Sequence, residues 1–219
     1  MNHSAEGVIR FDLTHTKTPA LPVEDTAGLR AWFIILRQLE LLGQDPGRYL
    51  GYAYGNISTR TQGGFVISCT QTSGKTALQQ EDFALVTGFD TPSNRLVSEG
   101  TCPPSSEAMT HGAVYQALPR TGAVFHVHSP IIWRQARALD LPETDPSIEY
   151  GTPEMAEAVI ILLRNNPAGV FCMGGHEDGI IAWGESTTEA GCRLLASLVR
   201  ALSDIGDAKG SESNQEDIM

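Results

Sequence analysis

Three histidines and one glutamate in this chain have residue types and spacing that suit metal-dependent chemistry. His126 and His128 lie two residues apart in GAVFHVH, a segment with the composition of a β-strand. Side chains of a strand alternate between its faces, so both imidazoles project with Val124, while Phe125 and Val127 project from the opposite face. Two neutral nitrogen donors side by side suit a Zn²⁺ site. An HxH pair is also compatible with a simple polar stripe on a half-buried strand.

A third histidine and a carboxylate complete the candidate site. His176 lies in GGHEDGI, a glycine-rich turn between two apolar segments. Three histidines with an open coordination position form the ligand set of a catalytic zinc, although Mn²⁺, Fe²⁺ or Co²⁺ could occupy the same site. Glu107 follows two prolines and two serines at the start of an expected helix. It is either a general acid/base beside the metal or a glutamate that complements the helix dipole.

Two segments rich in glycine, hydroxyl and amide groups could bind an anionic substrate. They are GYAYGNISTR (51–60) and CTQTSGKTAL (69–78), and Lys75 adds a positive charge. Backbone N–H groups exposed by glycine, together with hydroxyls, can hold a phosphate, but ordinary β-turns explain both segments equally well. TSGK is not a P-loop, because Cys69 stands where the spaced glycine of that motif belongs.

Apolar periodicity predicts one α/β domain over residues 24–205, between an irregular arm at 1–23 and a disordered tail at 206–219. Helices are expected at 29–42, 105–118, 130–139, 153–165 and 186–202. Short strands are expected at 52–54, 65–67, 83–86, 122–128, 170–173 and 179–183. Because short glycine turns join consecutive strands, we expect an α/β/α sandwich around a mixed, mostly antiparallel sheet.

The composition argues against several classes of protein. With 26 acidic and 15 basic residues among 219, the formal net charge is -11, and such a surface repels nucleic acid and anionic membranes. The sequence contains no apolar run near the roughly 20 residues of a membrane span and no signal-peptide pattern. The four cysteines are widely spaced without a CxxC pair, so we expect free thiols in a cytoplasmic protein.

Taken together, these motifs resemble the class II aldolase/adducin family. That family includes fuculose-phosphate and rhamnulose-phosphate aldolases, ribulose-phosphate 4-epimerases and methylthioribulose-phosphate dehydratases. The matching segments follow the family's order over roughly residues 28–202. They are GNIS, TSGK, SSE with His111 and Tyr115, AVFHVHSP, YGTPEMAEA, and GHEDGIIAWG with TTEA.

The resemblance implies a role for each candidate residue. His126, His128 and His176 would bind a divalent metal, and Glu107 would be the acid/base. The implied phosphate-binding residues are Asn56, Thr72, Ser73, Gly74, Ser105 and Ser106. The resemblance also implies a homotetramer and a lyase that cleaves or dehydrates a ketose or sugar phosphate through an enediolate.

Departures from the family pattern leave other functions open. The family usually has His-Gly where this chain has His176 followed by Glu177 and Asp178. No tyrosine follows Tyr150, so the C-terminal catalytic tyrosine of the aldolases has no match. Epimerases of the family tend to carry aspartate at the position of Glu107, which argues against an epimerase. The alternatives are an epimerase or decarboxylase that uses the same site, and a non-catalytic binding protein like the adducin head domain.

Overall fold

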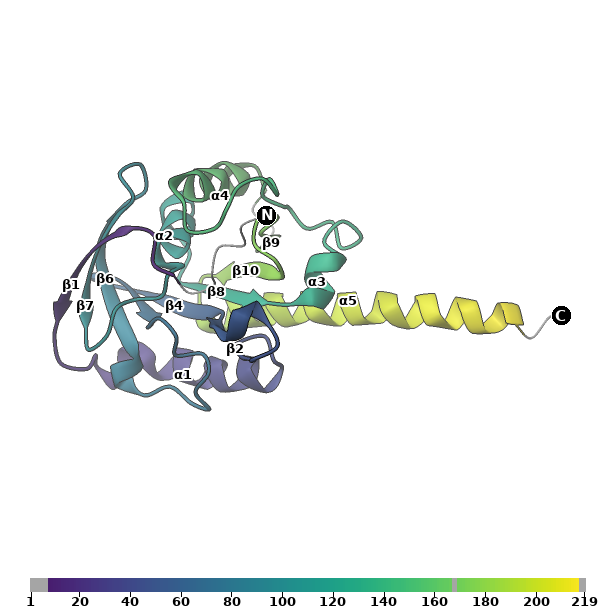
Figure 1. Ribbon diagram of the computed structural model, residues 1–219, viewed down its shortest axis with the longest axis horizontal. Helices are drawn as coiled ribbons and strands as arrows, with labels where there is room; N and C mark the ends of the chain where they lie inside the picture. Colours follow the sequence, from purple (N-terminus) through teal and green to yellow (C-terminus); the bar gives the residue numbers. More distant parts are fainter. Residues whose placement is uncertain (1–7, 167–168, 217–219) are drawn as a thin grey trace.

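The computed structural model describes residues 8–166 and 169–216 and has an eight-stranded sheet at its centre (Figure 1). Its strand order is β1-β7-β6-β5-β4-β8-β10-β9. All neighbours pair antiparallel except β1 and β7, so the expected α/β fold with a mostly antiparallel sheet is confirmed. The strands are β1 (Asp12–Lys17), β4 (Asn56–Thr61), β5 (Gly64–Ser68), β6 (Phe83–Asp90), β7 (Arg95–Gly100), β8 (Ala123–His128), β9 (Val170–Cys172) and β10 (Gly179–Gly184).

Helices cover both faces of this sheet and complete the three layers (Figure 1). One face is covered by α2 (Ala108–Ala117) and α4 (Pro153–Asn165). The other is covered by α1 (Val23–Gln38), α3 (Pro130–Arg134) and α5 (Thr187–Glu216). Smaller elements are the ribbon of β2 (Gly43–Gln44) and β3 (Ala53–Tyr54) and the 3₁₀ helices η1 (Tyr49–Gly51) and η2 (Gln80–Asp82).

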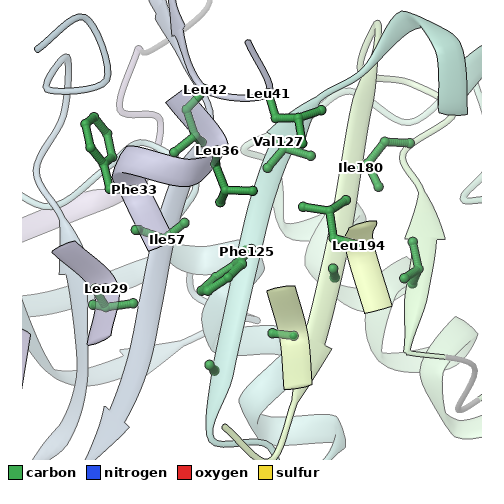
Figure 2. Packing of buried hydrophobic residues seen from close by; sticks show 14 of the residues in the cluster. Leu29, Phe33, Leu36, Leu41, Leu42, Ile57, Phe125, Val127, Ile180 and Leu194 are labelled. Atoms are coloured by element: carbon green, nitrogen blue, oxygen red, sulfur yellow. The ribbon is translucent and has the colours of Figure 1, made fainter. Parts of the chain in front are cut away.

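Strand alternation divides the buried apolar side chains into one cluster on each face of the sheet. From β8, Phe125 and Val127 join the cluster that contains side chains of α1 and α5 (Figure 2). Val124 joins the cluster on the side of α2 and α4. Burial of a side chain of this size contributes roughly 2–3 kcal/mol, so both clusters hold their helices to the sheet. His126 and His128 share the face of Val124, because side chains two residues apart project the same way.

Residues 56–61 form the central strand β4, whereas the sequence analysis treats them as a loop. Asn56 and Ser58 on this strand are buried. The Ser58 hydroxyl lies 2.7 Å from His111 Nδ1 and 2.8 Å from the Tyr115 hydroxyl, so it has hydrogen-bond partners on α2. The strand escapes prediction because its buried positions are partly polar, and apolar alternation is the usual signal for a strand.

The two ends of the chain carry more regular structure than the sequence predicts. In the arm expected at 1–23, residues 1–7 lie outside the described residues, and β1 pairs with β7 at the edge of the sheet. Such a strand is held mainly by backbone hydrogen bonds, so its polar sequence gives little signal. α5 continues through the expected tail to Glu216 and projects beyond the sandwich (Figure 1); residues 217–219 lie outside the described residues. None of the described helices is long and apolar enough to cross a membrane.

Cys69 and Cys102 form a disulfide, which corrects the expectation of four free thiols. The two cysteines are 33 residues apart and meet because the loop after β5 pairs with the loop before α2, as Cys69 and Pro104 do across an antiparallel bridge. Cys172 is a buried free thiol and Cys192 an exposed one. Sequence spacing gives no sign of the pairing, because only the tertiary fold brings the two loops together.

Candidate active site

The three histidines selected from the sequence meet at one end of β8. His126 and His128 lie on β8, and His176 lies in the turn between β9 and β10. All three are buried, and each offers a ring nitrogen within 4.8 Å of those of the other two. Their ring centroids are 5.0, 5.0 and 4.8 Å apart. Imidazoles grouped in this way can hold one metal ion.

Glycine and a tyrosine position the His176 side chain. A backbone hydrogen bond of 2.9 Å from Gly179 N to the carbonyl of His176 closes the turn. A Cβ on Gly175 would collide with the carbonyl oxygen of Ile148, so a glycine is required where the turn approaches the segment before α4. Tyr150, from the same segment, stacks on the His176 ring with a centroid distance of 4.4 Å and an interplanar angle of 25°. The turn therefore fixes the backbone of His176, and the Tyr150 ring fixes the orientation of its imidazole.

Burial keeps two of these imidazoles neutral and ready to act as ligands. Burial lowers the pKa of His126 and of His128 well below the ordinary value, and His176 lowers both further. His126 Nδ1 lies 3.3 Å from the Ile180 carbonyl, to which only a protonated nitrogen can donate. That tautomer leaves the lone pair on Nε2, which is buried and has no hydrogen-bond partner among the described residues. An imidazole that donates through one nitrogen and keeps a lone pair on the other suits a metal ligand.

Glu107 lies next to the histidine cluster and is 0% exposed. Glu107 directly precedes α2, whereas the sequence predicts it inside the first turn of this helix. The Thr110 hydroxyl donates a 2.7 Å hydrogen bond to Oε2, and Oε1 lies 3.8 Å from His176 Nδ1. The carboxylate therefore faces the cluster. Because burial of a carboxylate costs free energy, this position favours a chemical role over a contribution to the helix dipole alone.

Four of the six residues expected to bind phosphate line one small polar pocket. They are Asn56, Ser73, Ser105 and Ser106. Asn56 pairs with His126 across β4 and β8, and paired side chains project from the same face, so the pocket adjoins the histidine cluster. Asn56 Oδ1 is buried and accepts no hydrogen bond from the described residues. A ligand in the pocket could therefore reach toward the cluster.

The remaining residues of the TSGK segment point elsewhere. Thr72 and Gly74 do not line the pocket, and the Thr72 hydroxyl donates 2.7 Å to the carbonyl of Cys69. Lys75 Nζ forms a 2.6 Å ion pair with Asp82, so its positive charge is paired with that carboxylate and not directed into the pocket. The described residues that line the pocket carry no charged side chain, and an anion there would be held by hydroxyl, amide and backbone donors.

His111 is buried behind the site, and its Nδ1 lies 2.7 Å from the Ser58 hydroxyl. Burial lowers the pKa of His111 to about 3, so the ring is neutral at physiological pH. Its place in a chain of hydrogen bonds with Ser58 and Tyr115 connects α2 to the central strand β4.

Residues that the sequence analysis did not select surround His128. The Tyr49 ring packs edge-on against it with a centroid distance of 4.5 Å. The Tyr49 hydroxyl donates a 2.7 Å hydrogen bond to Asp178 and accepts one of 2.7 Å from Arg48. Of these three residues, Asp178 alone had a sequence signal, because it belongs to the acidic pair after His176 that departs from the family pattern.

The chain and its fold are similar to known proteins. The family described as Class II Aldolase and Adducin N-terminal domain matches residues 48–202. An L-fuculose-1-phosphate aldolase from Thermus thermophilus is 21% identical with a TM-score of 0.59, over 90% of this chain and 98% of that one. A putative aldolase/epimerase/decarboxylase from Klebsiella pneumoniae is 19% identical with a TM-score of 0.60, over 81% and 86% of the two chains. A sugar-phosphate aldolase from Thermotoga maritima is 14% identical with a TM-score of 0.61, over 82% and 95%.

Proposed function

Because the chain belongs to the class II aldolase and adducin family, we propose that it is a metal-dependent lyase that cleaves or dehydrates a ketose or sugar phosphate. The observation that carries the proposal is the buried cluster of His126, His128 and His176 with Glu107 beside it. Burial of so many polar groups opposes folding, so a protein that only binds a partner would gain nothing from it. This cost argues against the adducin-like binding function.

The cluster suits a divalent cation, and Zn²⁺ is the simplest choice for three imidazole ligands. His126, His128 and His176 would hold it, since their ring nitrogens converge and His126 Nε2 has no partner among the described residues. When bound, the cation supplies Lewis-acid stabilisation of negative charge that develops on substrate oxygens. Neutral imidazoles suit this task because they do not cancel the charge of the cation.

Glu107 would transfer the proton in this reaction. Its carboxylate is oriented by Thr110 and faces the histidine cluster, where the reacting carbon and oxygen atoms of the substrate would lie. Buried surroundings exclude water and so protect a carbanion-like intermediate from an unwanted proton.

The polar pocket would bind the phosphate of the substrate. Asn56, Ser105 and Ser106 would donate side-chain hydrogen bonds to it, whereas the Ser73 hydroxyl, which lines the pocket, donates 2.6 Å to the Gly55 carbonyl. Thr72 and Gly74 would shape the loop around Ser73. Because Asn56 stands opposite His126, one sugar phosphate could occupy the pocket and the histidine cluster together. We further propose a homotetramer in the cytoplasm. The Cys69–Cys102 disulfide is unusual for that compartment, so trapping of the thiol state in cells would test the location.

The decisive experiment combines metal analysis with two variants. Elemental analysis should find near-stoichiometric zinc or another divalent metal, and His126→Ala should lose it. Glu107→Gln should keep the metal and lose at least about a hundredfold in turnover, because general acid/base catalysis contributes that much. Glu157→Gln, an exposed glutamate on α4, is the matched control and should keep full activity.

Turnover would be measured on a panel of sugar phosphates that includes L-fuculose 1-phosphate, the substrate named for one structural neighbour. The products also separate the alternatives. Aldol cleavage releases two carbonyl fragments, dehydration releases water, decarboxylation releases CO₂, and epimerisation leaves an isomer of the same mass. Absence of bound metal after reconstitution would rule out the lyase mechanism and favour the binding protein.

A further inference from the structure

Two aromatic rings stand directly beside the histidine cluster, and a cation packs against both of them. The rings of Tyr49 and Tyr54 lie 4.5 and 5.5 Å from that of His128. The guanidinium of Arg48 stacks on both tyrosines, at 4.9 and 5.2 Å from their centroids. Arg48 also lies 3.8 Å from Asp178, two residues after the candidate ligand His176. Arg48, Tyr49 and Tyr54 thus form an aromatic and cationic wall next to the candidate metal ligands.

The wall is held in place by a strained turn and by Asp178, one of the two acidic residues that depart from the family pattern. Tyr49, Leu50 and Gly51 have successive φ values of 47°, 57° and 79°, in the left-handed region. Non-glycine residues adopt this region only where the surrounding contacts maintain it. Asp178 supplies such a contact, since it accepts the 2.7 Å hydrogen bond from the Tyr49 hydroxyl. Asp178 is therefore an anchor for the wall.

The guanidinium of Arg48 has N–H donors that are not used within the described residues. One of its five N–H groups donates to the Tyr49 hydroxyl. The other four make no hydrogen bond to the described residues. Its ion pair with Asp178 is 3.8 Å long, beyond hydrogen-bond distance. The Arg48 side chain is 30% exposed, so a ligand can approach it. A planar guanidinium with spare donors recognises a carboxylate through paired hydrogen bonds.

We propose that Arg48 is a specificity-determining residue that binds a carboxylate of the substrate beside the metal. The substrate would then be a 2-hydroxy or 2-oxo acid at its metal-binding end, with its phosphate in the pocket of Asn56, Ser73, Ser105 and Ser106. This inference rests on the proposed function, because it presupposes the bound cation.

The distribution of charge supports this assignment of the two ends. The pocket lining has no charged side chain among the described residues, whereas the guanidinium of Arg48 stacks on Tyr49, whose ring packs against His128. A neutral hydroxymethyl group at that position would offer the spare donors of Arg48 no charged acceptor, whereas a carboxylate would. A 2-hydroxy acid also presents two neighbouring oxygens to a cation while it keeps a carboxylate oxygen for the guanidinium.

The test is ligand binding to the protein loaded with Co²⁺, followed by its visible absorption spectrum. Glycolate, a 2-hydroxy acid, and imidazole, a neutral ligand, would be titrated separately. In Arg48→Met the dissociation constant of glycolate should rise at least about tenfold, as expected for loss of a charged hydrogen-bond pair. The constant for imidazole should stay within about twofold, since the metal and its ligands are unchanged.

Arg95→Met is the matched control for the loss of one positive charge. Arg95 is 71% exposed on β7, near the opposite edge of the sheet, so glycolate binding should stay within about twofold of the parent protein. Arg48→Lys keeps the positive charge but lacks the paired N–H donors of a guanidinium. Its dissociation constant for glycolate should fall between those of the parent protein and Arg48→Met.

Two results would overturn the proposal about Arg48 while Co²⁺ still binds. One is glycolate affinity that does not change in Arg48→Met. The other is a parallel loss of glycolate and imidazole binding, which would identify Arg48 as structural support for the metal ligands. Failure of the parent protein to bind Co²⁺ would instead overturn the proposed lyase function, and this inference with it.

Discussion

Strand β8 has two buried faces of opposite character. On the side of α1 and α5, Phe125 and Val127 pack among aliphatic and aromatic side chains (Figure 2). On the side of α2 and α4, His126 and His128 are as deeply buried but lie against other imidazoles and tyrosine rings. Burial stabilises the fold on the first face and opposes it on the second. The apolar face therefore supplies the stability that the polar face requires.

The largest effect is expected from the apolar face. Phe125→Ala should lower the free energy of unfolding by about 4 kcal/mol, because it removes a fully buried ring and leaves a cavity between α1 and the sheet. Urea denaturation of the metal-free protein would measure the change. A loss below about 1 kcal/mol would show that the two faces do not differ as described.

The second largest effect is expected at low pH, where the buried histidines of the polar face should lower the free energy of unfolding. The pKa of His111 is about 3 in the folded protein, against about 6.5 in the unfolded chain, so the unfolded state binds more protons below pH 6.5. Stability therefore falls as the pH drops from about 6.5 toward 3, and His111 alone accounts for about 3 kcal/mol by pH 4.5. The lowered pKa values of His126 and His128 act in the same direction.

Urea denaturation of the metal-free protein at pH 7, 5.5 and 4.5 would measure this dependence. The His111→Gln variant provides the comparison, because it lacks the titrating group and should show a shallower decline. An equal decline in both proteins would place the acid sensitivity outside His111.

Metal should compensate part of the cost of the polar face. Zinc at a free concentration of about 100 times its dissociation constant should raise the free energy of unfolding by about 2.7 kcal/mol, since only the folded state holds the three histidines together. A chelator should reverse the gain. Thermal unfolding with and without zinc would measure it, and Phe125→Ala should show the same increment as the parent protein.

The smallest effect is expected at His126, next to Phe125 on the same strand. His126→Leu keeps a side chain of similar size. It removes the buried Nε2, which has no partner among the described residues, and the long 3.3 Å hydrogen bond from Nδ1 to the Ile180 carbonyl. In the metal-free state its unfolding free energy should therefore stay within about 1 kcal/mol of the parent value. Zinc should no longer stabilise it. A loss as large as that of Phe125→Ala would mean that His126 is structural in the metal-free fold.

The active-site strand could be predicted because its two faces follow a simple alternation. GAVFHVH contains apolar residues at one parity and histidines at the other, so the shared face of His126 and His128 follows from strand geometry. The strand β4 could not be predicted in the same way. Its buried Ser58 is satisfied by His111 and Tyr115 on α2, partners that sequence periodicity does not reveal.

Local patterns along the chain were enough to predict the α/β class, the mostly antiparallel sheet and the residue types of the candidate site. Each of these depends on periodicity or on family motifs that involve neighbouring residues. The folded structure was needed to establish that His176 joins the pair on β8, that Cys69 meets Cys102, and that Tyr49 packs against His128. These contacts join segments that are distant in sequence, and loop closure and packing, rather than spacing, bring such segments together.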